Sequence, residues 1–193
     1  MTTALALFLA YLFGSIPFGL ILSRLAGEGD IREIGSGNIG ATNVLRTGNK
    51  GLAALTLLFD AGKAAVAGLL VGFAFGVPPL WGAAFALIGH CYPVWLKFRG
   101  GKGVATFFGA LLVGPILLFG LAALSWIAIA AATRYSSLAA LVTALVVLVV
   151  GWWLYPFPHV IGPLIVMVAL MFWRHRENIG RLVRGRESRI GAK

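Results

Sequence analysis

The stretch VATFFGALLVGPILLFGLAALSWIAIAAAT, residues 104–133, is a long apolar run, and how it folds decides the architecture. One helix of this length would measure about 45 Å, whereas the hydrocarbon core of a bilayer is about 30 Å thick. Gly114 and Pro115 form a natural break within the run. We therefore expect two helices, 104–113 and 115–133. The first, about 15 Å long, cannot cross alone and is expected to begin in a polar cavity.

The composition indicates a membrane protein. Of the 193 residues, 60% are hydrophobic and 11% are charged, and a water-soluble fold could not bury so much apolar surface. Apolar runs of about 20 residues favour helices over a barrel. The predicted fold is an all-α integral membrane protein, a single domain over residues 1–193, with seven transmembrane helices of which one is short. The predicted spans are 3–23, 51–72, 80–96, 104–113, 115–133, 138–154 and 159–174.

The Lys and Arg residues orient this bundle. With the break at Gly114-Pro115, they fall on one side, and the opposite turns 73–79, 113–115 and 154–159 contain none. The positive-inside rule then places the N-terminus outside and the basic tail, about 175–193, in the cytoplasm. No positive residue precedes the first apolar run, so a cleaved signal peptide is not expected. The net charge of +10 suits contact with anionic lipid headgroups, and no nucleic-acid partner is expected.

Four polar clusters lie on the predicted cytoplasmic side, and the first is GSGNIGATNVLR, residues 35–46. Its glycines let backbone N–H groups approach an anion, and the guanidinium of Arg46 matches phosphate oxygens. The letters satisfy G-x-G-x-x-G, but no strand precedes them, which argues against a dinucleotide site. The structural alternative is a flexible turn with an interfacial arginine. The candidate phosphate-binding residues in this cluster are Gly35, Ser36, Gly37, Asn38, Gly40, Thr42, Asn43 and Arg46.

The second cluster, GHCYPVWLKFRGGKGVAT at residues 89–106, contains Lys102 just before a predicted helix. A lysine at a helix N-terminus is a good phosphate ligand, and Thr106 adds a hydroxyl in the first turn. The motif is not a Walker A loop, because the required first glycine is Leu96. The alternative is a lysine that only sets topology. Gly101 and Gly103 complete the candidate phosphate-binding residues here.

The other two clusters are RYSS, 134–137, and HRENIGR, 175–181. Ser136 or Ser137 could donate to an oxyanion, or merely cap a helix. If the last helix continues past the bilayer, a polar stripe forms from His175, Asn178 and Arg181. For the remaining basic residues of the tail we expect a solvated segment; these are Arg184, Arg186, Arg189 and Lys193.

Asp60 and Lys63 share a face of the second span, and charges at that depth are costly and functional by default. The alternative is a neutralised structural pair. His90 is expected to be hydrogen-bonded within the bundle. The three histidines are scattered, so no metal site is expected. The H-x-x-x-x-D pair of many glycerolipid acyltransferases is absent, and no Ser-His-Asp order is apparent.

SGNIGATNVLR, the Asp60–Lys63 pair, GHCYPVWLKFRGGKGVAT and HRENIGRL together resemble the bacterial membrane glycerol-3-phosphate acyltransferases that use an acyl-phosphate donor, the PlsY family. The likeness covers almost the whole chain. It implies a seven-span bundle in the cytoplasmic membrane with its site facing the cytoplasm. It also implies transfer of an acyl group from acyl phosphate to the 1-hydroxyl of sn-glycerol 3-phosphate, without acyl-CoA, acyl carrier protein or cofactor.

The resemblance also implies roles. Its catalytic residues correspond to Ser36, Arg46, Lys102, Ser137, His175 and Asn178. Arg46, Lys102 and Ser36 would bind phosphate and neutralise the leaving group, and the other three would position glycerol phosphate and its hydroxyl. Asp60, Lys63, His90 and Arg181 would support them. The general base is either His175 or a substrate phosphate oxygen, and the sequence leaves both open.

Membrane phospholipids are the expected surroundings, and a monomer is compatible with the sequence, which does not determine the oligomeric state. Two other functions are weighed against acyl transfer. A transporter of a phosphorylated small solute would use similar basic pockets and a broken helix. Against it, the polar residues cluster on one side and two inverted halves are not evident. A purely structural subunit would not need such specific glycine, amide and arginine clusters.

Overall fold

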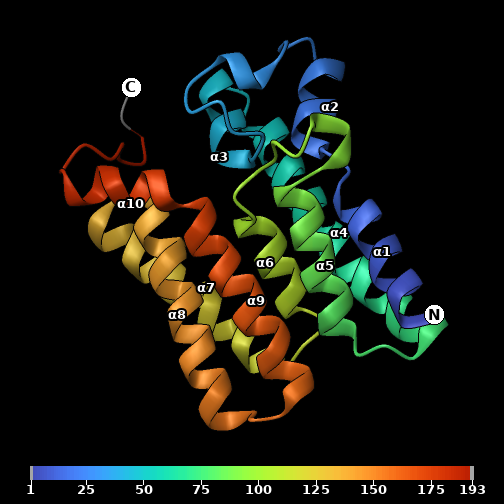
Figure 1. The fold of residues 1–193 in the computed structure, drawn as a ribbon. Coiled ribbons are helices and arrows are strands. Elements are labelled where there is room, and N and C mark those ends of the chain that lie inside the picture. The colour runs from blue at the N-terminus through green and yellow to red at the C-terminus, as the bar shows by residue number, and fades with distance from the viewer. Residues whose placement is uncertain (1, 192–193) are drawn as a thin grey trace. The chain divides into compact units, whose positions relative to one another are not determined.

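The computed structural model describes residues 2–191, and within them every regular element is a helix (Figure 1). The chain divides into two compact units, Met1–Val113 and Gly114–Lys193. Helix α6 ends at Leu111 and α7 begins at Ile116, so the predicted break at Gly114-Pro115 is confirmed. The single-domain organisation stays a prediction. The end of the predicted basic tail, residues 192 and 193, lies outside the described residues.

Unit 1 holds the first two polar clusters. Helix α4 starts where it does because the side chain of Asn49 caps it, accepting a hydrogen bond from Leu52 N at 3.0 Å. The elements of unit 1 are α1 (Thr2–Gly14), α2 (Phe18–Leu25), η1 (Ile31–Glu33), α3 (Ala41–Val44), η2 (Leu45–Thr47), α4 (Lys50–Phe75), α5 (Pro79–Cys91), η3 (Val94–Leu96) and α6 (Val104–Leu111).

Two predicted spans of unit 1 differ in detail from the observed helices. The span 3–23 is interrupted, because α1 ends at Gly14 and Pro17, which lacks an amide hydrogen, precedes α2. The span 80–96 is shorter as a helix than expected. Helix α5 stops at Cys91, two residues before Pro93, and only the short turn η3 follows.

Small residues allow the helices of unit 1 to pack at close range. Helix α4 packs against α1, α5 and α6. A Cβ atom added at Gly14 would lie 2.1 Å from the Ala86 carbonyl oxygen on α5, and one at Gly109 on α6 would lie 1.9 Å from that of Ala61 on α4. Backbones this close are typical of helix pairs in membranes, where small residues allow the van der Waals packing that holds helices together.

Unit 2 is an antiparallel helix group closed at one end by a short helix (Figure 1). Its elements are α7 (Ile116–Thr133), α8 (Ser136–Leu154), α9 (Pro158–Arg174) and α10 (Arg176–Val183). Helix α8 packs against α7 and α9, and α10 contacts α8 and α9. The last helix does not continue straight, because α10 is bent by 57° from α9. The single polar stripe expected if the last helix continued is therefore not formed: His175 lies at the joint, and Asn178 and Arg181 lie on α10.

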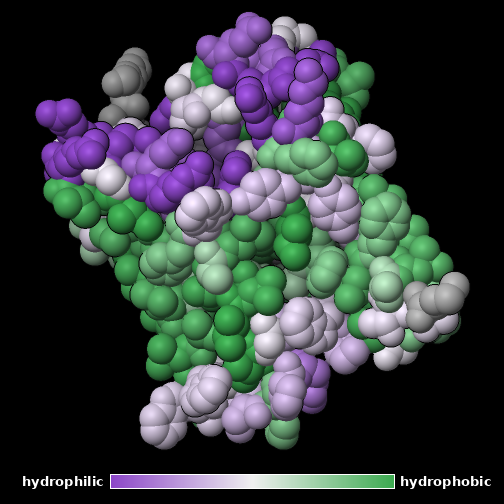
Figure 2. Space-filling model, in the orientation of Figure 1, coloured by the Kyte–Doolittle hydropathy of each residue, from purple (hydrophilic) through white to green (hydrophobic). Residues whose placement is uncertain are grey.

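Large apolar side chains are exposed along the long helices of both units. Phe73 on α4 is 95% exposed, and Leu58, Ile116 and Leu124 are also exposed. Hydrophobic residues cover the middle of the helices of each unit, and hydrophilic residues gather at one end (Figure 2). The segments long and apolar enough to cross a bilayer are Thr2–Leu25, Lys50–Phe75, Ile116–Thr133, Ser136–Leu154 and, if α9 and α10 count as one bent span, Pro158–Val183. The count of seven stays a prediction.

Candidate active site

Asn43 braces the glycine-rich loop 35–46 from inside. Its buried amide oxygen accepts hydrogen bonds from Ser36 N at 3.0 Å and from Ser36 Oγ at 3.3 Å. Its amide nitrogen donates to the carbonyl oxygens of Ile31 at 2.7 Å and Ile34 at 3.2 Å. These four bonds use the full capacity of the amide, so Asn43 orients Ser36 and holds the segment 31–46 together.

Gly35 brings Arg46 onto the backbone of this loop. Gly35 has a φ of +56°, in the left-handed region that favours glycine. A Cβ atom here would lie 2.3 Å from Arg46 Nη1 and 2.6 Å from Asn43 Oδ1. The Arg46 side chain therefore covers the backbone that precedes Ser36. The structure thus brings Ser36, Asn43 and Arg46 together.

The other predicted residues of the loop lie around this centre. Gly37 also has a positive φ, of +66°, and Gly40 is the residue before α3. Thr42 is exposed on α3, and Asn38 is half-buried. Beneath them lies an apolar cluster of Leu20, Ile31, Ile39, Val44, Leu52 and Ala53. Leu96 of the second polar segment also packs against this cluster. The 35–46 loop and the 89–106 segment therefore rest on the same apolar residues.

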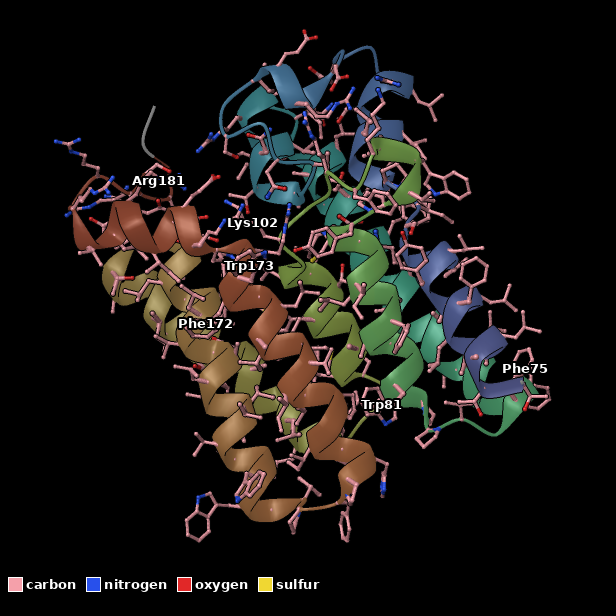
Figure 3. The ribbon with its side chains drawn as sticks, in the orientation of Figure 1. Phe75, Trp81, Lys102, Phe172, Trp173 and Arg181 are labelled. Carbon is pink, nitrogen blue, oxygen red and sulfur yellow. The ribbon has the colours of Figure 1, made fainter. Side chains whose placement is uncertain are left out.

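The GGKG segment, residues 100–103, is anchored to the end of α5. Gly100 N donates to the Cys91 carbonyl oxygen at 3.2 Å, and Gly101 N donates to that of His90 at 3.0 Å. Gly103, with a φ of +83°, turns the chain into α6. Half-buried Lys102 thus stands just before the helix N-terminus, where backbone N–H groups favour an anion (Figure 3).

Thr106 lies in the first turn of α6 and is fully buried. Its Oγ1 atom has no hydrogen-bond partner among the described residues. A buried hydroxyl without a partner costs about 1–3 kcal/mol, so native structures rarely leave one without a reason. A bridging water or an oxygen-rich ligand at the start of α6 would complete its bonding.

Asp60, Lys63 and His90 form one buried charged cluster in unit 1. Lys63 Nζ lies 2.8 Å from Asp60 Oδ1 and 2.9 Å from His90 Nδ1, and His90 Nδ1 lies 3.5 Å from Asp60 Oδ1. The sequence paired Asp60 with Lys63, but the part played by His90 appears only in the folded chain.

In unit 2, three predicted residues converge on one carboxylate that sequence reasoning missed. Glu187 Oε1 accepts hydrogen bonds from Ser137 Oγ at 2.7 Å and Asn178 Nδ2 at 2.5 Å. Glu187 Oε2 accepts one from Arg181 Nε at 2.6 Å, on α10 (Figure 3). Burial alone would raise the pKa of Glu187, but hydrogen bonds from Asn178, Ser137 and Arg181 outweigh it and hold the pKa below 4.5. Glu187 is the only acidic residue in the otherwise basic segment 181–193, which was the available signal.

His175 lies at the joint between α9 and α10. It is buried, and its Nδ1 atom lies 2.8 Å from the Met171 carbonyl oxygen. Because a carbonyl only accepts, Nδ1 carries a proton, and whenever the ring is neutral its lone pair is on Nε2.

The tail is exposed as expected, and it also makes backbone contacts. Arg184, Arg186 and Arg189 have exposed side chains, but the backbone returns to the start of α8. Ile190 N donates to the Arg134 carbonyl oxygen at 2.6 Å, and Arg134 Nη2 donates to the Ile190 carbonyl oxygen at 3.0 Å. This return brings Glu187 to Ser137. Lys193 lies outside the described residues.

Glu187 holds Ser137, Asn178 and Arg181 together, an arrangement called here the Glu187 clamp. We expect Glu187→Gln to weaken this clamp. The variant loses the negative charge that strengthens all three hydrogen bonds to this side chain, so kcat/KM should fall about tenfold, and stability should fall by about 1–3 kcal/mol. The matched control is Glu177→Gln, which changes an exposed carboxylate on α10 and should alter neither. Unchanged activity and stability in Glu187→Gln would contradict the clamp.

The same clamp predicts a pH dependence with a defined sign. The folded-state pKa of Glu187 is depressed, so its contribution is fully present above its ordinary value of 4.5 and is lost as the pH falls through the lower folded-state pKa. Thermal unfolding of detergent-solubilised protein followed from pH 7 to pH 3 should show a drop below pH 4.5 that is smaller in Glu187→Gln. Equal drops in both proteins would contradict this assignment.

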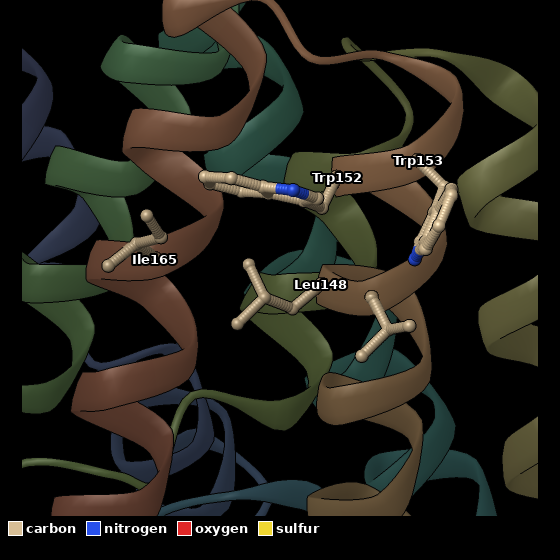
Figure 4. A pocket seen from close by; sticks show the side chains of 5 residues that line it. Leu148, Trp152, Trp153 and Ile165 are labelled. Carbon is tan, nitrogen blue, oxygen red and sulfur yellow. The ribbon is translucent and has the colours of Figure 1, made fainter.

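Two further features lie apart from these polar residues. Among the described residues, no group of three or more His, Cys, Asp or Glu side chains is placed to hold a metal ion. In unit 2, an apolar pocket of about 310 Å³ is lined by Leu148, Val149, Trp152, Trp153 and Ile165 (Figure 4). With no titratable group in its lining, this pocket cannot perform acid–base or phosphate chemistry.

Comparison with known proteins identifies the family. A family model described as glycerol-3-phosphate acyltransferase matches residues 4–185. The "Glycerol-3-phosphate acyltransferase 1" of Rhizobium johnstonii is 54% identical over 190 residues, covering 97% of this chain and 91% of the relative. The glycerol-3-phosphate acyltransferase of Maricaulis maris is 56% identical over 187 residues, covering 95% and 85%.

Solved structures agree with this. The crystal structure of PlsY, an integral membrane glycerol 3-phosphate acyltransferase, in its glycerol 3-phosphate form has a TM-score of 0.91 and 36% identity, covering 99% of this chain and 96% of that one. Its lysophosphatidic acid form has a TM-score of 0.90 and 34% identity, with the same coverage. The chain therefore belongs to the PlsY family of integral membrane glycerol-3-phosphate acyltransferases.

Proposed function

We propose that this chain transfers a fatty acyl group from acyl phosphate to the 1-hydroxyl of sn-glycerol 3-phosphate, in bacterial phospholipid synthesis. The products are lysophosphatidic acid and inorganic phosphate. The related crystal structures are described as glycerol 3-phosphate and lysophosphatidic acid forms, which are the acceptor and the product of such a transfer. Both substrates carry phosphate, so the protein must offer anion-binding groups beside an apolar surface for the acyl chain.

The observation that carries this proposal is the start of α6. Lys102 precedes the helix N-terminus, and the buried Thr106 Oγ1 has no hydrogen-bond partner among residues 2–191. Backbone N–H groups, an ammonium and an unpaired hydroxyl are together the donor set that a phosphate takes. A second such set is the glycine-rich loop with Ser36 and Arg46.

The chemistry follows from these groups. The 1-hydroxyl oxygen attacks the acyl carbonyl carbon, the carbon–oxygen bond to phosphate breaks, and phosphate leaves with the bonding electrons. Arg46, Lys102 and Ser36 neutralise the charge that grows on the departing phosphate. In unit 2, Ser137, His175 and Asn178 position glycerol phosphate. The hydroxyl proton passes to His175 Nε2 or to a substrate phosphate oxygen.

No covalent acyl-enzyme is needed. Acyl phosphate is a mixed anhydride with a good leaving group, so orientation and preorganised charge can supply most of the acceleration. Arg46 and Lys102 bring positive charge to the leaving phosphate, so the step is proposed without a cofactor or metal.

The deciding experiment uses the purified full chain in lipid bilayers. Palmitoyl phosphate and glycerol 3-phosphate are supplied, palmitoyl-CoA is the comparison donor, and both lysophosphatidic acid and inorganic phosphate are measured. We expect equal amounts of the two products from acyl phosphate and none from acyl-CoA. A folded sample that makes lysophosphatidic acid from neither donor would overturn the proposal.

We also propose seven spans in the cytoplasmic membrane, with the N-terminus outside and the polar loops facing the cytoplasm. The support is the positive-inside distribution of Lys and Arg. Because the only cysteine, Cys91, is buried, introduced cysteines can report the topology. In intact cells, a membrane-impermeant maleimide should label Ala74→Cys, at the end of α4. Glu33→Cys should react only after permeabilisation, and the reverse pattern would invert the topology.

A further inference from the structure

The buried charged cluster of unit 1 is expensive to keep. The side chains of Asp60, Lys63 and His90 are almost completely excluded from the surface, with exposures of 3%, 0% and 4%. Each buried ion costs several kcal/mol of desolvation, and well-packed apolar residues often stabilise a protein as well or better. Stability alone is therefore a weak reason for this chain to carry three polar groups here.

The ammonium of Lys63 is fully satisfied by three acceptors. It donates to Asp60 Oδ1 at 2.8 Å, to the Ile16 carbonyl oxygen at 2.9 Å, and to His90 Nδ1 at 2.9 Å. An ammonium has donors only, so Nδ1 of His90 accepts and the neutral ring carries its proton on Nε2. The ion pair therefore determines both the tautomer and the orientation of the His90 ring.

The other edge of this ring lies against the GGKG segment. A Cβ atom added at Gly101 would lie 2.1 Å from His90 Nε2 and 2.7 Å from Cε1. Gly101 N also donates to the His90 carbonyl oxygen at 3.0 Å. His90 thus holds Gly101 by main chain and side chain together, and Gly101 directly precedes Lys102.

The cluster also reaches the glycine-rich loop through α2. Ile16 lies in the break between α1 and α2, and its carbonyl oxygen accepts a hydrogen bond from Lys63 Nζ. On α2, a Cβ atom added at Gly19 would lie 2.0 Å from the carbonyl oxygen of Ile39, within the 35–46 loop. One ammonium therefore tethers elements that support both polar loops of unit 1.

We propose that Asp60, Lys63 and His90 form a positioning cluster, which fixes the GGKG segment through Gly101 and so holds Lys102 in place for the substrate phosphate. The inference rests on the proposed function, in which Lys102 binds phosphate. The three residues touch no substrate and act through Gly101 and Lys102. Their purpose is geometric accuracy at the phosphate site, where an error of about 1 Å can cost 10²-fold in rate.

The contact between His90 and Gly101 allows a compensation test. Gly101→Ala places a methyl group against the imidazole, so we expect kcat/KM to fall at least about tenfold. His90→Ala removes the imidazole and should also lower kcat/KM. In the double variant the new methyl group has room, because the imidazole is gone. The kcat/KM of the double variant should therefore be about tenfold higher than the value obtained by multiplying the two single losses. Such coupling is typical of residues in contact. Additive losses would overturn the proposal.

The ion pair needs a readout that a merely structural role would not change. We expect Asp60→Asn to raise both the KM for the phosphate substrates and the inhibition constant of inorganic phosphate about tenfold, measured well below the unfolding temperature. The matched control is Thr56→Val, which removes a buried hydroxyl from the same helix, bonded to the Leu52 carbonyl oxygen at 2.9 Å. It should leave both constants unchanged.

If Asp60→Asn does not fold, Asp60→Asn/Lys63→Gln removes both charges without leaving one alone. The proposal is overturned if the variant that folds has the same KM for the phosphate substrates and the same inhibition constant for inorganic phosphate as the unmodified protein. The two proposals fail separately. An unmodified protein that makes no lysophosphatidic acid from acyl phosphate refutes the proposed function, whereas an active one with unaffected cluster variants refutes only this inference.

Discussion

Lys102→Met should lower kcat/KM for acyl transfer by about 10²–10³-fold, the usual cost of removing one preorganised group that stabilises transition-state charge. The side chain stands before the N-terminus of α6, where it would oppose the charge that grows on the departing phosphate. Methionine keeps the length and the apolar stem, so the packing at the end of α5 should persist. Thermal unfolding should therefore stay close to that of the unmodified protein.

The matched control is Lys97→Met in the same segment. Lys97 is exposed, and its replacement should change kcat/KM by less than about twofold, as surface substitutions usually do. Lys102→Arg keeps the charge but replaces a compact ammonium by a larger planar fork, so it should recover only part of the activity. Lysophosphatidic acid formation in bilayers measures all three. A fully active Lys102→Met would remove Lys102 from the phosphate site.

Gly35→Ala should lower kcat/KM about 10²-fold, because it displaces two groups at once. The added methyl would lie 2.3 Å from Arg46 Nη1 and 2.6 Å from Asn43 Oδ1. Arg46 would have to leave the loop, and the oxygen that orients Ser36 would shift. The φ of +56° adds backbone strain of about 1–2 kcal/mol for any residue with a side chain.

Gly48→Ala separates the strain from the contact. Gly48 has a φ of +89°, and nothing lies within 4 Å of the position of its Cβ atom. Its replacement carries a similar backbone cost without touching Arg46, so it should lower stability but leave kcat/KM nearly unchanged. Equal losses of activity in the two variants would mean that backbone strain, and not the placement of Arg46 and Ser36, explains the effect.

Much of the architecture could be predicted because it depends on local chemistry. Apolar runs of bilayer length predicted the long helices, since no soluble fold could hide them. Pro115 and the glycine before it predicted the break between α6 and α7, because proline lacks the amide hydrogen that a continuing helix needs. The break at Ser15–Pro17 carries the same signal, but the apolar run around Pro17 is short enough to read as one span, so it was missed.

The candidate residues were found in the same way, through clusters of glycine, hydroxyl, amide and basic side chains along the chain. Which of them touch one another was not readable, because those contacts join residues far apart in sequence. His90 meets Lys63 at a separation of 27 residues, and Glu187 meets Ser137 at one of 50.

The sequence by itself determined the long apolar helices, the break between α6 and α7, and the family. The tertiary structure alone decided that Asn43 braces the loop from inside, that Glu187 clamps Ser137 and Asn178, and that His90 supports Gly101. The physical reason is that helix formation and turn chemistry depend on neighbours along the chain, whereas a buried polar group takes whichever partner the packing of distant helices places within hydrogen-bonding distance.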